Sequence, residues 1–149
     1  MNKAGDHVEA NERERERLRA LIERLTDDDL ARKVDERWTV ADVLGHIAFW
    51  DARALYLASK LEGGEPFVAG EHEPEDVDWI NESAWPLIRE IPARQAARLA
   101  LRLAEETDSL VARVDAAKCW PAEPSSPLNP RRATHRGEHL DQIEQALGN

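Results

Sequence analysis

Apolar residues recur at helical spacing in four separate stretches of this chain, and this periodicity most restricts the folds open to it. Residues three or four positions apart lie on one face of an α-helix, so each stretch can present an apolar stripe to a core. The stretches cover about residues 6–25, 39–61, 92–114 and 130–147. We find no alternation typical of a half-buried strand. The sequence therefore predicts an all-α fold, in which four amphipathic helices of roughly 20 residues form a bundle.

Local signals predict where these helices begin. Thr39, followed three residues later by Asp42, is a short capping box that predicts the start of the second helix. Asn129 and Pro130 predict a cap and a first-turn proline for the last helix. Thr26, which precedes three aspartates, either ends the first helix or caps a short turn of its own.

The connections between the helices are expected to be long. Asp76–Arg89 predicts an extra short helix, interrupted near Pro86, within the connection to the third bundle helix. A polar stretch at 62–74 and a proline- and serine-rich segment at 121–128 predict extended connections. Two such connections favour a topology other than a simple up-and-down bundle.

Length and charge restrict the function. A chain of 149 residues with 42% hydrophobic content suits one domain, residues 1–149, with one ordinary core. The net charge of -10 repels a phosphate backbone, so we expect no nucleic-acid partner. The chain opens without an apolar signal core and has no run of eighteen apolar residues, which predicts a cytoplasmic protein without a membrane partner. The single cysteine, Cys119, excludes an internal disulfide.

Three histidines form the most informative candidate site. His135 and His139 are four residues apart, so both imidazoles lie on one helix face and can reach a single ion. His46 falls at the edge of the apolar stripe of the second helix, where it can face a cavity. Three imidazoles would bind a divalent ion and leave a coordination position for water or substrate. The alternative interpretation is that these histidines are solvated surface groups, or core residues whose polar atoms already have hydrogen-bond partners.

Helix geometry suggests supporting residues. Gln142 lies about 20° from His135 around the helix, where it could hydrogen-bond a metal-bound water. Arg131, one turn before His135, could meet an anionic group of the substrate. Asp51 projects toward the buried side of its helix, where it either pairs with an arginine or orients a histidine.

Two segments carry a resemblance to a known family. Residues 38–51, WTVADVLGHIAFWD, resemble the second-helix signature of the DinB-like family, whose members are also described as YfiT-like metal-dependent hydrolases. Residues 135–143, HRGEHLDQI, are similar to the last-helix motif of that family, in which two histidines precede a Gln-Ile pair. The order of the helices matches over nearly the whole chain.

The resemblance implies one divalent metal ion, commonly zinc or nickel, held by His46, His135 and His139. It also implies kinship with thiol-dependent enzymes, including the mycothiol-dependent maleylpyruvate isomerase and bacterial glutathione-like S-transferases, and frequent homodimers. We therefore expect a hydrolase or an S-transferase that uses a low-molecular-weight thiol, with a small-molecule substrate. The alternative is a non-catalytic dimeric bundle that binds a metal or a small molecule, which a fourth ligand such as His72 would favour. Apolar residues around Trp79 and Trp85 are the expected dimer surface.

Overall fold

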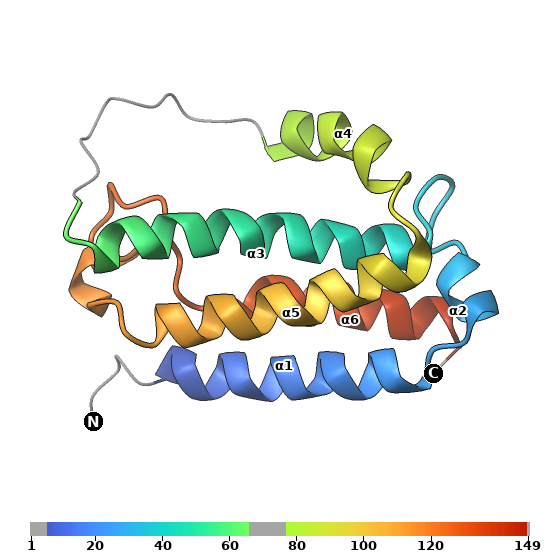
Figure 1. The fold of residues 1–149 in the computed structure, drawn as a ribbon, viewed down its shortest axis with the longest axis horizontal. Coiled ribbons are helices and arrows are strands. Elements are labelled where there is room, and N and C mark those ends of the chain that lie inside the picture. Colours follow the sequence, from blue (N-terminus) through green and yellow to red (C-terminus); the bar gives the residue numbers. More distant parts are fainter. Residues whose placement is uncertain (1–5, 66–76, 149) are drawn as a thin grey trace.

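The computed structural model describes residues 6–65 and 77–148, and every regular element in these ranges is a helix (Figure 1). Four long helices form a bundle: α1 (Asp6–Arg24), α3 (Val40–Glu62), α5 (Ala93–Val111) and α6 (Ala133–Ala146). Shorter elements are α2 (Asp27–Ala31), α4 (Val77–Ile88) and the 3₁₀ turn η2 (Ala116–Lys118). The predicted all-α four-helix bundle is confirmed. Within the described ranges, no helix has both the length and the apolar character that a membrane span requires.

The helices of the bundle do not follow a simple up-and-down order. α3 packs against α5 and α6, and α1 packs against the same two helices from the opposite corner. α1 and α6 run in one direction, whereas α3 and α5 run in the other (Figure 1). α3 and α5 follow one another in the bundle and run in the same direction, so the connection between them must span the length of the bundle. α4 lies within that connection, against the outer side of α3. The prediction of long connections is therefore confirmed, and most of the polar stretch predicted at 62–74 lies outside the described residues.

Capping boxes start two of the helices. Thr39 accepts a hydrogen bond from the backbone nitrogen of Asp42, and the Asp42 carboxylate accepts one from the Thr39 nitrogen. Thr26 and Asp29 repeat the pattern at α2. Each box satisfies amide groups that have no partner inside the helix, which is why these short motifs predict the boundaries correctly.

The predicted start of the last helix is wrong. α6 begins at Ala133 rather than at Asn129 and Pro130, and it has 14 residues rather than roughly 20. The Asn129 side chain accepts a hydrogen bond from the Arg131 nitrogen and so stabilises a turn before the helix. Asn11, buried on α1, accepts from the Ala133 nitrogen and donates to the Pro130 carbonyl, both at 2.8 Å. A side chain from a distant helix therefore sets this boundary.

Pro86 does not interrupt α4, contrary to the prediction. The helix is continuous from Val77 to Ile88, with Pro86 in its last turn. A proline removes one amide donor from the helix, and near the end of a helix few bonds remain to be disrupted. The expected first residue of this helix, Asp76, lies outside the described residues.

The buried core has two apolar parts with a polar layer between them. One part combines α1, α2, the first half of α3, the first half of α5, and α6. The other combines the second half of α3 with the end of α5, Cys119 and Leu128. Asp51 and Thr107–Asp108 lie between these parts along α3 and α5 and are buried. We call these residues, together with the buried Arg136 of α6, the polar layer.

Two helix glycines should respond in opposite ways to alanine. A Cβ at Gly45 would lie 2.7 Å from Cγ2 of Ile88, whereas a Cβ at Gly137 would meet the Glu14 side chain at 3.5 Å, an ordinary contact. We expect Gly137→Ala to raise the free energy of unfolding by up to about 1 kcal/mol through helix propensity. Gly45→Ala should lower it, because Ile88 and α4 must shift. Urea unfolding measures both, and an equal gain at both positions would contradict close packing of α4.

Candidate metal centre

The three predicted histidines converge at the contact between α3 and α6. Nε2 of His46 lies 3.1 Å from Nε2 of His139 and 3.2 Å from Nε2 of His135. One ring nitrogen from each of the three side chains can be chosen so that all three lie within 4.8 Å of one another. α3 and α6 are antiparallel neighbours, and the four-residue spacing stacks His135 and His139 on the face that meets His46.

The spacing of the nitrogens fits a metal ion. Bond lengths of about 2.0–2.1 Å in a tetrahedral zinc site place two ligand nitrogens about 3.3 Å apart. The observed separations of 3.1 and 3.2 Å are close to this value. Three imidazoles fill three positions, so a fourth would remain for a small molecule, as in catalytic rather than structural sites.

Two of the imidazoles are held in the neutral form that binds metals. Burial, together with the nearby His139, lowers the pKa of His46 to about 4. Burial lowers the pKa of His135 to about 2, with further contributions from His139, His46, Arg132 and Arg136. At neutral pH both rings therefore carry a lone pair that is available to an ion.

Gln142 orients one of the histidines. Its Oε1 lies 3.0 Å from Nδ1 of His139, so Nδ1 donates and the Nε2 lone pair of His139 is directed at the other two rings. This contact differs from the expected one with a metal-bound water, which stays a prediction. Nδ1 of His135 is the one side-chain nitrogen or oxygen that is buried without a hydrogen-bond partner in residues 6–65 and 77–148. The Nδ1 contact of His139 therefore has no counterpart at His135.

Two pockets of about 390 and 350 Å³ meet at the histidines. Asn81 of α4 lines both, and its Oδ1 accepts a hydrogen bond from Nε1 of Trp50 at 2.8 Å. The larger pocket carries the carboxylates of Asp35, Asp78 and Glu82, and we call it the acidic pocket. The smaller one is lined by Arg132, Trp50 and Val77 besides the histidines, and we call it the arginine pocket. α4 thus covers a site whose two sides differ in charge.

The polar layer lies directly behind the histidines. The Arg136 guanidinium donates to both Asp108 oxygens at 2.7 and 2.6 Å and to Asp51 at 2.9 Å. Arg132 donates to the other Asp51 oxygen at 3.0 Å, and Arg15 donates to Asp108 at 2.8 Å. Burial acts to lower the pKa of Arg136, but its bonds to Asp108 and the charge of Asp51 raise it overall. The predicted pairing of Asp51 with an arginine is confirmed.

Sequence reasoning missed the arginines and Asp108 of this network. The buried carboxylate at position 51 signals that a cation must lie nearby, but it does not say which one. The structure places Arg131 at the surface, close enough to His7 to help burial lower the pKa of that histidine. Arg132 is the arginine that lines a histidine pocket. The expected role of Arg131 stays a prediction, and His72 lies outside the described residues.

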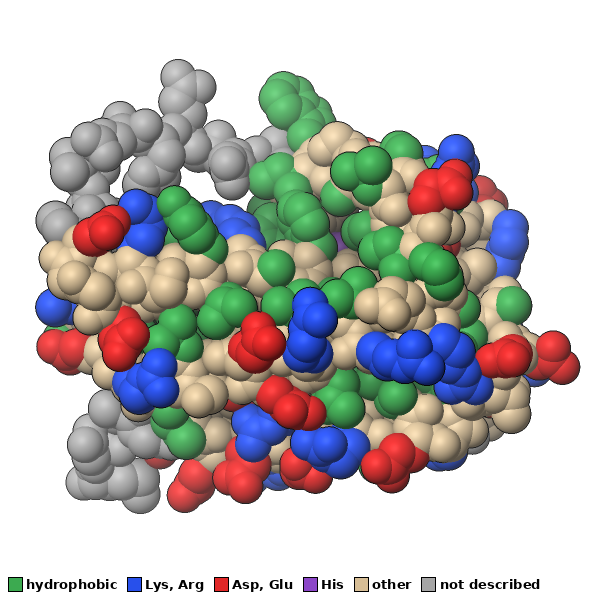
Figure 2. All heavy atoms as spheres, viewed as in Figure 1, with side chains coloured by type: hydrophobic (Ala, Val, Ile, Leu, Met, Phe, Trp, Pro, Cys, Tyr) green, Lys and Arg blue, Asp and Glu red, His purple; other side chains and the backbone are tan. Residues whose placement is uncertain are grey.

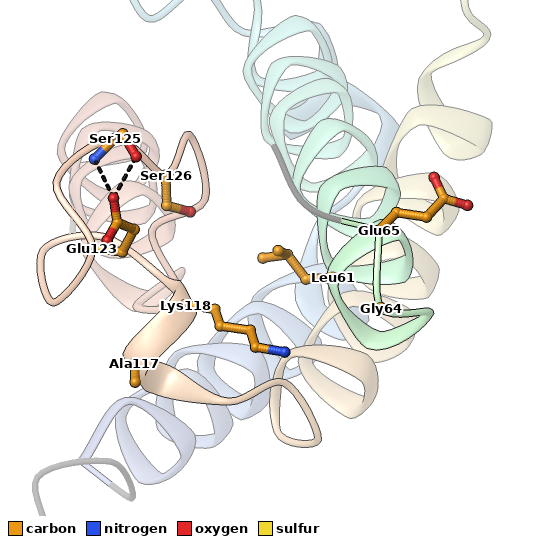
Figure 3. Close-up of a pocket in the computed structure, with 8 residues that line it drawn as sticks. All are labelled: Leu61, Gly64, Glu65, Ala117, Lys118, Glu123, Ser125 and Ser126. Carbon is orange, nitrogen blue, oxygen red and sulfur yellow. Dashed lines mark hydrogen bonds between the residues drawn. The ribbon is translucent and has the colours of Figure 1, made fainter. Parts of the chain in front are cut away.

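Another cavity, of about 320 Å³, lies where α3 ends beside the 116–126 segment (Figure 3). Within it, both the nitrogen and the hydroxyl of Ser125 donate to Glu123, so these polar groups satisfy one another. Burial, together with the charge of Asp115, raises the pKa of nearby Cys119 to about 11, so its thiol is protonated at neutral pH. This end of the bundle therefore offers no activated nucleophile in the described residues.

Comparison with known proteins agrees with the fold and the histidine geometry. The model of the DinB superfamily matches residues 10–143. The chain belongs to the DinB superfamily. The match includes His46, His135 and His139, and it extends from the first bundle helix into the last. The family resemblance seen in the two sequence motifs is confirmed.

A curated relative from Mycobacterium tuberculosis (strain CDC 1551 / Oshkosh), named "Putative mutator protein MutT4", is 32% identical over 119 residues. The alignment covers 76% of this chain and 47% of the relative, so the chain spans about half the length of that protein. No solved structure matches the chain. The DinB superfamily member described here is therefore similar to one part of a longer protein.

The metal-free DinB-like bundle should lose stability as the pH falls below about 6.5. His46 and His135 stay neutral when folded down to about pH 4 and 2, whereas the unfolded chain binds protons below about 6.5. For each pH unit that the pH falls in this range, each of these two histidines should lower the free energy of unfolding by at most about 1.4 kcal/mol. Urea unfolding between pH 7 and 5 measures this slope. The double variant His46→Gln, His135→Gln should show a shallower slope, and identical slopes would contradict the shifts.

Proposed function

We propose that this DinB superfamily protein is a metal-dependent enzyme in which His46, His135 and His139 hold one divalent ion, zinc or nickel. The observation that supports this most directly is the convergence of three Nε2 atoms at separations of 3.1 and 3.2 Å beside two pockets. The substrate is a small molecule, because pockets of about 390 and 350 Å³ lie at the lower end of the range for ligand sites. The net charge of -10 argues against a nucleic-acid partner.

The ion would supply a Lewis acid that makes a nucleophile available near neutral pH, either from water or from a low-molecular-weight thiol. The residues of this chain then have distinct roles. The histidines bind the ion, His46 and His135 being neutral at pH 7, and Gln142 fixes the ring orientation of His139. Asn81 and Trp50 place α4 over the site, where it limits access of bulk water. The buried, protonated Cys119 supports a nucleophile that does not come from the protein.

The experiment begins with elemental analysis of protein purified without a chelating resin. The metal-loaded protein is then incubated with electrophilic substrates, with and without a low-molecular-weight thiol. Product formation that requires the thiol would identify an S-transferase, and product formation without it would identify a hydrolase. Stoichiometric metal without either reaction would favour the non-catalytic binding module. Cys119→Ala is a control that should retain activity.

We also propose that the protein forms a homodimer through α4. Trp79 and Leu87 are 75% and 76% exposed, and hydrophobic side chains gather over α4 in Figure 2. Trp85 is held within the chain by Arg37, whose guanidinium lies 4.2 Å from the ring centre. An apolar surface of this kind commonly marks an interface.

Light scattering should give a mass near twice 16.9 kDa, and Trp79→Asp should shift it toward one chain. The matched control is Tyr56→Asp, at an aromatic residue that is 60% exposed on α3. This control should leave the mass unchanged. A monomer at all concentrations of the natural sequence would refute the dimer.

A further inference from the structure

We propose that the arginine pocket binds the carboxylate of a small organic acid through Arg132. That this acid is a substrate rests on the proposed function, but its contact with Arg132 does not require the metal ion.

Arg132 uses one edge of its guanidinium inside the protein. Its Nε donates to Asp51 Oδ1 at 3.0 Å, and its Nη2 lies 3.4 Å from the carbonyl oxygen of Trp50. The end of the group, formed by Nη1 and the outer hydrogen of Nη2, carries two parallel N–H bonds. This arrangement matches the two oxygens of a carboxylate. The internal bonds fix the fork in advance, so little side-chain entropy is lost when a ligand binds.

The charges behind the pocket leave a positive excess. Arg136 shares Asp51 with Arg132, and it shares Asp108 with Arg15. Three guanidinium groups therefore face two carboxylates. The described residues that line the arginine pocket include no acidic side chain, whereas those of the acidic pocket include three. An anion is thus repelled by one side of the site and attracted to the other.

The walls of the arginine pocket suit an apolar body attached to the anion. Trp50 and Val77 supply apolar surface, and Asn81 supplies an amide. The Arg132 side chain is only 12% exposed, so an ion pair formed there is screened less than one at the surface. The volume of about 350 Å³ accepts a compact acid. Benzoate has this chemistry, and benzamide is its neutral isostere.

The test follows the Trp50 indole N–H signal by NMR in metal-free and zinc-loaded protein, with the signal assigned through Trp50→Phe. We expect benzoate to shift this signal in both forms and benzamide to leave it unchanged. Arg132→Gln should weaken benzoate binding roughly ten- to hundredfold, and Arg132→Lys should weaken it less, because the charge is kept and the fork is lost. Arg98→Gln removes an exposed charge on α5 outside both pockets and should have no effect.

The variants separate this inference from the proposed function. Stoichiometric zinc together with benzoate binding that ignores Arg132→Gln, or with no benzoate binding, would overturn the carboxylate site and leave the metal site intact. Absence of zinc together with benzoate binding that depends on Arg132 would do the reverse. Weakening by Arg131→Gln instead of Arg132→Gln would also overturn the assignment. Circular dichroism of each variant checks that the helices are retained, and Arg132→Lys supplies the comparison if Arg132→Gln unfolds.

Discussion

Replacing His135 and His139 together by alanine should reduce the bound zinc from one ion per chain to roughly none, because one imidazole alone does not form a site. The single variant His46→Ala should also lose most of the ion. Gln142→Ala should retain the site but weaken zinc binding roughly ten- to hundredfold, since it removes the partner that orients His139. Equilibrium dialysis followed by elemental analysis measures the stoichiometry and the affinity.

The matched control for this series is His7→Gln, which alters a buried histidine of α1 near Arg131. It should leave zinc binding unchanged. Stoichiometric zinc in the double alanine variant would refute the three-histidine site.

Chelation of the natural protein should leave its helical circular dichroism in place, because two apolar clusters hold the bundle. Collapse of the helices would show that the ion is a structural clamp.

Asp51→Ala should lower the free energy of unfolding by about 3–5 kcal/mol, the largest stability effect that we expect from a single substitution. The change removes a carboxylate that accepts hydrogen bonds from Arg132 and Arg136, and Arg136 is fully buried. Removal of one partner leaves a buried cation without part of its compensation. Urea unfolding of the metal-free protein at pH 7 measures the loss.

Arg17→Ala provides the comparison for this prediction. Arg17 also contacts acidic residues, namely Glu14, Asp141 and Glu144, but its side chain is 29% exposed and that of Asp141 is 73% exposed. A solvated ion pair contributes only about 0–1 kcal/mol. If Arg17→Ala and Asp51→Ala cost the same, burial would not be the source of the stability of the polar layer.

Features that depend on spacing within one helix could be predicted from the sequence. The pair His135 and His139 and the capping box at Thr39 are of this kind, since residues three or four apart meet whatever surrounds the helix. His46 could be placed at the edge of the apolar stripe of its helix. In a four-helix bundle, a side chain at that edge can contact only a few faces of the other helices. This reasoning predicted the fold class, and it grouped the three histidines that lie together.

Features that depend on contacts between distant elements could not be predicted in this way. The start of α6 depends on Asn11, which is 122 positions away from Ala133. The choice between Arg131 and Arg132 depends on where that helix starts, because a shift of one residue turns a side chain by about 100°. The position of α4 depends on the contact of Ile88 with Gly45. No local signal encodes these pairings.

The polar layer also determines helix register. Sliding of α6 past α3 by one turn, about 5.4 Å, would let apolar side chains find new apolar neighbours at little cost. The same slip would carry the buried Arg136 guanidinium away from its bonds to Asp51 and Asp108. A buried cation that loses its partners costs several kcal/mol. The three imidazoles come from two separate helices and must meet within a few tenths of an ångström. The buried ion pairs thus fix the register of α6 against α3. The apolar core can therefore vary in sequence while the three histidines stay together.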